Sequence, residues 1–123
     1  MPKNPGSGRK ARVKSQFELS LIEKITSNGR PNGQPYSEKS VLTYTNNLYN
    51  FSKQFTETFD SLEFLDNYKE VLETLDTSKT SQGKLYSTST KIAMTNAIII
   101  SLIASGQVYS DDPGNLIRNY SVV

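Results

Sequence analysis

Cysteine and histidine are both absent from this chain. Without cysteine it has no disulfide, no thiolate nucleophile and no sulfur-rich zinc site. Without histidine it lacks the commonest general base and the commonest ligand of transition metals, so Ser-His-Asp and Cys-His sites cannot be assembled from it. We therefore expect a protein that is not an enzyme and that uses no cofactor and no metal.

Long apolar runs are also missing. The longest, residues 92–104, is interrupted by Thr95, Asn96 and Ser101, and it is shorter than the ~20 residues that a membrane-spanning helix needs. Residues 1–6 contain no apolar segment of the kind that a signal peptide requires. We expect no membrane span and no secretion by a signal peptide.

Apolar residues are scarce as well. They make up 35% of the 123 residues, against roughly 45–50% in an average soluble domain when glycine is counted. A chain of this length supports one domain with one modest core. Part of the chain is therefore expected to stay outside that core.

Charge is unevenly distributed along the chain. Residues 1–14 contain five cations and no acid, a charge of +5, whereas the remainder contains nine basic and twelve acidic residues, a charge of −3. The first segment also has two prolines, two glycines and little apolar surface, so it cannot offset the entropy cost of folding by itself. We expect an extended basic N-terminal arm on a mildly acidic body.

Two helices are predicted in the first half of the body. The segment Ser15-Gln16-Phe17-Glu18 has the spacing of a capping box, and the helix that it opens ends at Asn28-Gly29. A second helix starts with Ser37 as N-cap and extends to near Thr58. Its apolar stripe, at alternating steps of three and four residues, consists of Val41, Tyr44, Leu48, Phe51 and Phe55.

Two or three further helices are predicted in the second half. One covers roughly residues 67–75, and the next opens near residues 87–89 and ends at Gly106. The latter is apolar around most of its circumference, which is typical of a helix buried on all sides. Asp111-Asp112-Pro113 resembles another helix start, with an inner face of Leu116, Ile117 and Tyr120.

The sum of these elements is an all-α fold, a small bundle of four to five helices. We divide the chain into a basic flexible arm at residues 1–14, a helical bundle domain at residues 15–106, and a C-terminal segment at residues 107–123 that starts a further helix.

Several segments share a pattern with one family. Residues 37–48, SEKSVLTYTNNL, resemble the S-x-x-S-x-x-T-Y-x-x-x-L helix that opens the core-binding domain of tyrosine recombinases (phage integrases). With the preceding Arg30-Pro31-Asn32, the pattern resembles the integrase-like proteins of large double-stranded DNA viruses. Residues 62–65 are similar to that family's short d-l-x-f-L element, and residues 89–98 to its s-T-k-x-x-l-n-A-i helix.

The resemblance covers about residues 20–105 and implies a SAM-like four-helix domain, which in recombinases clamps one face of a DNA site. The catalytic domain of recombinases, with its Arg/Lys/His set and Tyr nucleophile, has no counterpart in this sequence. The resemblance therefore implies DNA binding without catalysis.

Ten residues are candidates for contact with nucleic acid or another partner. For the arm, the alternatives are binding to phosphates, a solubilising tail, or contact with an acidic protein. Lys39 and Thr43 lie off the apolar stripe, where they either contact DNA as the resemblance implies or are simply solvated. The ten residues are Lys3, Arg9, Lys10, Arg12, Lys14, Arg30, Lys39, Thr43, Lys84 and Lys91.

The other candidates flank loops and helix starts. Arg30, with Asn32 and Gly33, forms either a phosphate-gripping loop or a plain connector between helices. Lys84 and Lys91 flank the start of the fourth helix, where an anion can bind, although capping alone explains the serines and threonines there. The acids between residues 57 and 76 predict a solvated surface that repels DNA or docks a basic protein.

Two functions are compatible with these features. The first is a non-catalytic DNA-binding module from a large DNA virus or similar element, contacting mainly phosphates of double-stranded DNA. The alternative is a minor capsid or assembly protein whose arm threads along neighbouring virion proteins. Both place the protein in the virion or the host cell interior, and neither involves a small-molecule substrate.

Overall fold

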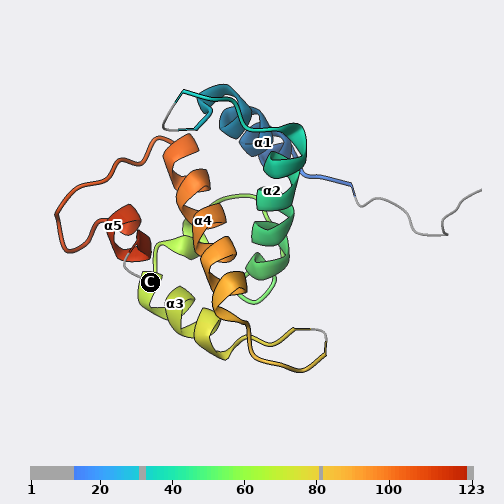
Figure 1. Ribbon diagram of the computed structural model, residues 1–123, viewed down its shortest axis with the longest axis vertical. Coiled ribbons are helices and arrows are strands. Elements are labelled where there is room, and N and C mark those ends of the chain that lie inside the picture. The colour runs from blue at the N-terminus through green and yellow to red at the C-terminus, as the bar shows by residue number, and fades with distance from the viewer. Residues whose placement is uncertain (1–12, 31–32, 81, 122–123) are drawn as a thin grey trace, which may run out of the picture.

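The structure is a computed structural model that describes residues 13–30, 33–80 and 82–121. These residues form a helical bundle with no β-strand beyond one isolated bridge, so the predicted all-α bundle of four to five helices is confirmed (Figure 1). Most of the predicted arm, residues 1–12, lies outside the described residues. The elements are α1 (Gln16–Asn28), α2 (Glu38–Ser52), the 3-10 turn η1 (Glu63–Leu65), α3 (Tyr68–Thr77), α4 (Thr88–Ala104) and α5 (Leu116–Ser121).

Serine caps start the three long helices, as their sequences predict. The hydroxyl of Ser15 accepts the N–H of Glu18 at 3.1 Å, and the hydroxyls of Ser37 and Ser87 do the same three residues on, at 3.1 and 3.2 Å. Each such bond satisfies one of the N–H groups that a helix start leaves without a partner. At its other end α1 stops at Gly29, whose φ of 67° suits glycine.

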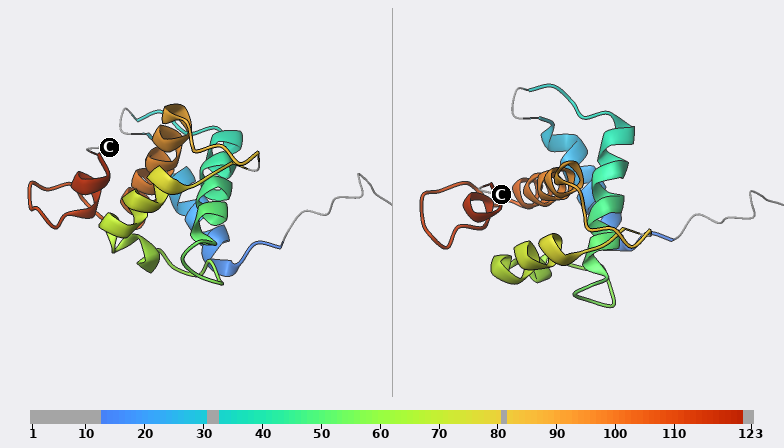
Figure 2. Two further views of the ribbon diagram at one scale, coloured as in Figure 1. Left: turned by 90° about the horizontal axis from the view of Figure 1, so that it is seen from below. Right: turned by 60° about the horizontal axis from the view of Figure 1, so that its bottom comes forward.

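The bundle is built around α4, which packs against α1, α2 and α5 (Figures 1 and 2). Helices α2 and α4 run antiparallel, so the start of α2 lies at the same end of the bundle as the end of α4. The core joins all five helices through their buried side chains, among them Leu21, Ile25, Val41, Leu48, Phe51, Leu65, Val71, Leu75, Ile98, Leu102, Ile117 and Tyr120.

Two predictions about burial are wrong. Tyr44 is only half-buried, and Thr45 takes a core position, where its hydroxyl donates to the carbonyl of Val41 at 3.1 Å inside the helix. Helix α4 is not buried all round, since Ile92 and Ile103 are 50% and 43% exposed. Its neighbours cover one broad side and leave Ile92 and Ile103 on the side that faces solvent.

The predicted end of α2 is also wrong, because the helix stops at Ser52 rather than near Thr58. After Ser52 the N–H groups of Gln54 and Phe55 bond carbonyls three residues back, at 3.2 and 2.9 Å. This tighter turn carries Phe55 onto Phe64, with ring centroids 5.6 Å apart. Aromatic packing therefore decides where the helix ends.

The predicted start of the last helix is wrong by a few residues, since α5 begins at Leu116. The residues before it form a closed turn, in which the N–H of Asn115 bonds the carbonyl of Asp112 at 2.9 Å. Asn115 then acts as the cap, because its side-chain oxygen accepts the N–H of Arg118 at 2.9 Å. The predicted inner face is largely confirmed, with Ile117 and Tyr120 4% and 1% exposed.

Tyr120 fastens α5 to the rest of the core. Its hydroxyl donates to the carbonyl of Leu65 at 2.6 Å, a buried bond between residues 55 apart in sequence. Burial, reinforced by the carboxylate of Asp66, raises the pKa of the Tyr120 phenol far above its ordinary value. Residues 116–121 thus share one core with residues 15–106.

Replacing Tyr120 by Phe is expected to lower the free energy of unfolding by about 1–3 kcal/mol, because the buried carbonyl of Leu65 loses its donor. Urea unfolding followed by circular dichroism measures this loss. Tyr68→Phe is the matched control, since it removes the same hydroxyl from a partly buried ring of α3 and should unfold like the parent.

The stability difference between the parent and Tyr120→Phe should depend on pH. The phenol titrates near 10.0 in the unfolded chain and well above that in the folded chain. Its stabilisation is therefore complete below pH 10 and is lost as the pH rises further, since the unfolded state releases the proton first. The stability gap between parent and Tyr120→Phe should shrink above pH 10, and a constant gap would contradict the assignment.

Ser101 and Ser52 make a second matched pair. Both are buried, at 0% and 1% exposure, but the Ser52 hydroxyl donates to the carbonyl of Tyr49 at 2.7 Å, whereas the Ser101 hydroxyl has no partner among the described residues. Ser52→Ala should cost about 1 kcal/mol, and Ser101→Ala should be neutral or stabilising by up to about 1 kcal/mol. Thermal unfolding distinguishes these outcomes, and a clear loss in Ser101→Ala would contradict the prediction.

Candidate nucleic-acid interface

One face of α2 carries a row of exposed polar side chains. The predicted contacts Lys39 and Thr43 belong to it, and later residues continue the same spacing of three and four positions. We call this row the α2 polar face, and it consists of Lys39, Thr43, Asn46, Asn50 and Lys53, all exposed. The row lies opposite the buried stripe that packs into the core.

The α2 polar face contains no carboxylate. Glu38 is the single acid of α2, and it precedes Lys39 by one residue, so it projects roughly 100° away around the helix. At a rise of ~1.5 Å per residue the row is about 21 Å long. It therefore offers two ammonium groups, two amides and a hydroxyl along one edge of the bundle.

Two contacts orient side chains near the two ends of this row. The hydroxyl of Thr43 donates to the carbonyl of Lys39 at 2.9 Å, which leaves the hydroxyl oxygen able to accept further bonds. At the other end, the ammonium of Lys53 lies 4.7 Å from the centroid of the Tyr49 ring. This cation–π contact holds the charge against the helix while the side chain stays exposed.

The chain that leads back to the basic segment leaves the bundle beside the C-terminal half of α2. Phe59 joins the two, with its ring 5.2 Å from that of Phe17 and 6.0 Å from that of Tyr49. The Ser15 hydroxyl also donates to the carbonyl of Phe59 at 2.9 Å. Half-buried Lys14 therefore lies at this end, while Lys3, Arg9, Lys10 and Arg12 lie outside the described residues.

Arg30 lies at the opposite end, just before α2. Its guanidinium stands 4.7 Å over the ring of Tyr36, which in turn meets Tyr44 edge-on at 5.7 Å. Burial and the neighbouring Tyr44 raise the pKa of Tyr36, while Arg30 opposes this shift. The backbone N–H groups of Arg30 and Gly33 already donate within the loop, at 2.8 and 2.9 Å, so the guanidinium is the group that Arg30 can offer to an anion.

Lys84 and Lys91 lie apart from Arg30 and Lys39. The turn that holds Lys84 adjoins the end of α2 instead, since the side-chain amide of Gln54 donates to the Ser78 hydroxyl at 3.2 Å. Because α2 and α4 run antiparallel, the start of α4 lies at the end of the bundle remote from Arg30 and Lys39. Lys84 is exposed in the turn that the Lys79–Leu85 bridge closes.

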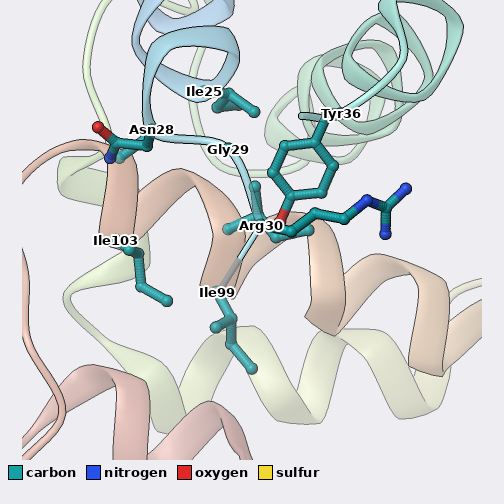
Figure 3. A pocket seen from close by; sticks show the side chains of 9 residues that line it. Ile25, Asn28, Gly29, Arg30, Tyr36, Ile99 and Ile103 are labelled. Atoms are coloured by element: carbon teal, nitrogen blue, oxygen red, sulfur yellow. The ribbon is translucent and has the colours of Figure 1, made fainter. Parts of the chain in front are cut away.

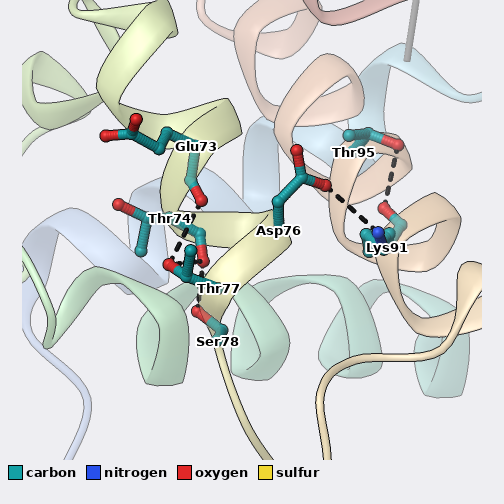
Figure 4. A network of polar contacts seen from close by, with 7 residues as sticks. All are labelled: Glu73, Thr74, Asp76, Thr77, Ser78, Lys91 and Thr95. Carbon is teal, nitrogen blue, oxygen red and sulfur yellow. Dashed lines mark hydrogen bonds and ion pairs between the residues drawn. The ribbon is translucent and has the colours of Figure 1, made fainter.

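Lys91 already has an acidic partner, as Figure 4 shows. Its ammonium meets the carboxylate of Asp76 at 3.1 Å, with the two side chains 29% and 68% exposed. Beside this pair, the hydroxyls of Thr77 and Ser78 close the end of α3 by donating to the carbonyls of Glu73 and Thr74 at 3.2 and 2.6 Å. Lys91 therefore links α4 to α3, and its charge is partly neutralised there.

Acidic side chains gather on other elements. The seven acids between residues 57 and 76 are all exposed, on the loop after α2, on η1 and on α3. Such a surface repels phosphates. Its η1 and α3 parts lie on elements other than α2, while Glu57 and Asp60 lie on the loop that follows Lys53. The acids are Glu57, Asp60, Glu63, Asp66, Glu70, Glu73 and Asp76.

Reasoning from the sequence missed Asn46, Asn50 and Lys53. The signal was present, since these residues repeat the spacing of Lys39 and Thr43 on the side opposite the apolar stripe.

Comparison of the chain with protein-family models, with curated proteins and with solved structures gives no match. Among the described residues, no group of three or more acidic side chains is placed to hold a metal ion. No helix in that part of the chain has the length and apolar character needed to cross a membrane.

Proposed function

We propose that this chain is a non-catalytic DNA-binding module, in which the α2 polar face lies along duplex DNA and the basic residues 1–14 neutralise phosphates. The observation that carries the proposal is the exposed, carboxylate-free row on α2, beside which the chain from residues 1–14 joins the bundle. The +5 charge of that segment would add to the positive potential of the row, because the described chain leaves the bundle beside α2.

The resemblance to recombinase core-binding domains supports the same surface. The segment that carries its main motif, residues 37–48, begins at the cap of α2 and covers most of that helix. Lys39 and Thr43, the residues of this segment that the resemblance implies in DNA contact, both lie on the exposed face. Tyr44 is directed toward Tyr36 instead and serves packing.

The chemistry of the row suits phosphates more than bases. Lysines meet phosphates as point charges, while asparagine and threonine bond phosphate or sugar oxygens and, in a groove, base edges. A row of about 21 Å spans roughly six base pairs at ~3.4 Å each. We infer binding that depends strongly on salt and only weakly on base sequence.

A structural role in a virion remains the second candidate. Three large apolar side chains lie exposed on loops, where they suit contact with neighbouring proteins: Leu85 at 58%, Val108 at 75% and Tyr109 at 59% exposure. In this role residues 1–14 would lie on protein rather than on DNA. A viral source, and a place in the virion or the host cell interior, belong to both candidates.

The salt dependence of duplex binding tests the role of the basic segment. The log–log slope of affinity against salt is expected to lose about 3–4 units in magnitude when residues 1–12 are deleted, because four phosphate-neutralising cations go. Fluorescence anisotropy with a labelled 20-base-pair duplex measures both slopes. An unchanged slope contradicts the proposal, and absence of binding at low salt favours the structural role.

The α2 polar face is tested by reversing its two charges. Lys39→Glu combined with Lys53→Glu should weaken duplex binding by about tenfold or more at low salt, since two phosphate contacts are replaced by repulsions. The matched control is Lys24→Glu combined with Lys69→Glu, which changes the net charge equally on two exposed lysines of α1 and α3, outside the row. Equal losses in both variants would mean that α2 is not the interface.

A further inference from the structure

An open apolar pocket of about 460 Å³ lies at the end of the bundle where α1 and α4 finish (Figure 3). Its walls are isoleucines, Ile25 from α1 and Ile99, Ile100 and Ile103 from α4, with the ring of Tyr36 on one side. Ile103 is 43% exposed, so the pocket leaves apolar surface in contact with water. Burial of that surface would be favourable.

The rim of this pocket carries a positive charge. Arg30 belongs to the lining, and its guanidinium is held over the Tyr36 ring at 4.7 Å. No carboxylate is among the described residues that line the pocket. The chemistry that fits is thus an apolar side chain with a carboxylate close by.

The chain itself displays this chemistry a few residues after the pocket. Val108 and Tyr109 are 75% and 59% exposed, and the exposed acids Asp111 and Asp112 follow them. This segment, residues 107–113, connects α4 to α5 and swings away from the bundle in Figure 1. We call it the α4–α5 loop.

Hydrogen bonds hold the α4–α5 loop in shape. The side-chain amide of Asn115 donates to the carbonyl of Val108 at 2.8 Å, and the Tyr109 hydroxyl donates to the carboxylate of Asp111 at 3.1 Å. The N–H of Gly114 bonds the Asp112 carboxylate at 2.9 Å. A loop ordered in this way loses little conformational entropy when it docks.

We propose that two copies of the chain form a dimer, in which Val108 and Tyr109 of each copy fill the isoleucine pocket of the other. The carboxylates of Asp111 and Asp112 then meet Arg30 across the interface. Apolar match and opposite charge both point to this occupant.

The position of the two features favours a reciprocal contact. Ala104 lines the pocket and Val108 follows four residues later, so pocket and loop lie beside each other at one end of the molecule. A two-fold axis at that end brings each loop to the other pocket at the same time. The loop does not fill its own pocket, because α5 is fastened to the core by Tyr120 and draws the loop away.

Sedimentation equilibrium of the full chain without DNA tests the dimer. We expect a reversible monomer–dimer equilibrium, with a dissociation constant raised about tenfold or more in Val108→Ser combined with Tyr109→Ser. Leu85→Ser is the control, because Leu85 is exposed at 58%, close to the value for Tyr109, but lies before the start of α4, whereas the pocket lies at the end of that helix. A chain that stays monomeric up to millimolar concentration overturns the proposal.

A charge exchange identifies the partner surfaces. Arg30→Glu alone, and Asp111→Arg with Asp112→Arg alone, should each abolish the homodimer through like charges at both contacts. In a mixture of the two variants both contacts again join opposite charges, so a heterodimer should form. A mixture that stays monomeric contradicts the pairing, whatever the DNA-binding tests show.

Retained circular dichroism spectra exclude unfolding of these variants. Deletion of residues 1–12 should leave dimerisation unchanged, and this separates a failure of the dimer from a failure of DNA binding.

Discussion

The burial of α4 is the interaction on which the rest of the fold depends. Ala97 and Ile98 are fully buried and Leu102 nearly so, between α1, α2 and α5. A chain with 35% apolar residues can complete one such core and little more. Because the apolar stripe of α2 packs against α4, the opposite side of α2 faces water. The polar row that we propose as a DNA contact is a consequence of that packing.

Much of the helical arrangement could be predicted from the sequence. The caps at Ser15, Ser37 and Ser87 and the apolar periodicity of α2 depend on neighbours in sequence, and they predict the helix starts correctly. Lys39 and Thr43 could be placed on an exposed face for the same reason. Local spacing determines such features before any tertiary contact forms.

The predictions from the sequence are wrong where contacts between residues distant in sequence determine the structure. The end of α2 depends on Phe55 reaching Phe64, and the burial of Thr45 in place of Tyr44 depends on how α2 turns toward the core. Periodicity also cannot tell which side of an all-apolar helix stays uncovered, as Ile103 shows. The ion pair between Lys91 and Asp76 joins residues 15 apart in sequence, and no sequence pattern predicts it.

The α2 polar face and the proposed dimer interface meet near the start of α2. Tyr36, which walls the pocket, precedes the cap of α2 by one residue, so the proposed dimer places the starts of both α2 helices near its centre. The N-terminal segments leave beside the far halves of these helices, each helix being about 22 Å long. Two polar faces and two basic segments would then act on one duplex, and linkage of this kind raises affinity without any new contact. In the proposed function, a chain without histidine and cysteine would bind DNA through exposed side chains whose positions are determined by the packing of α4.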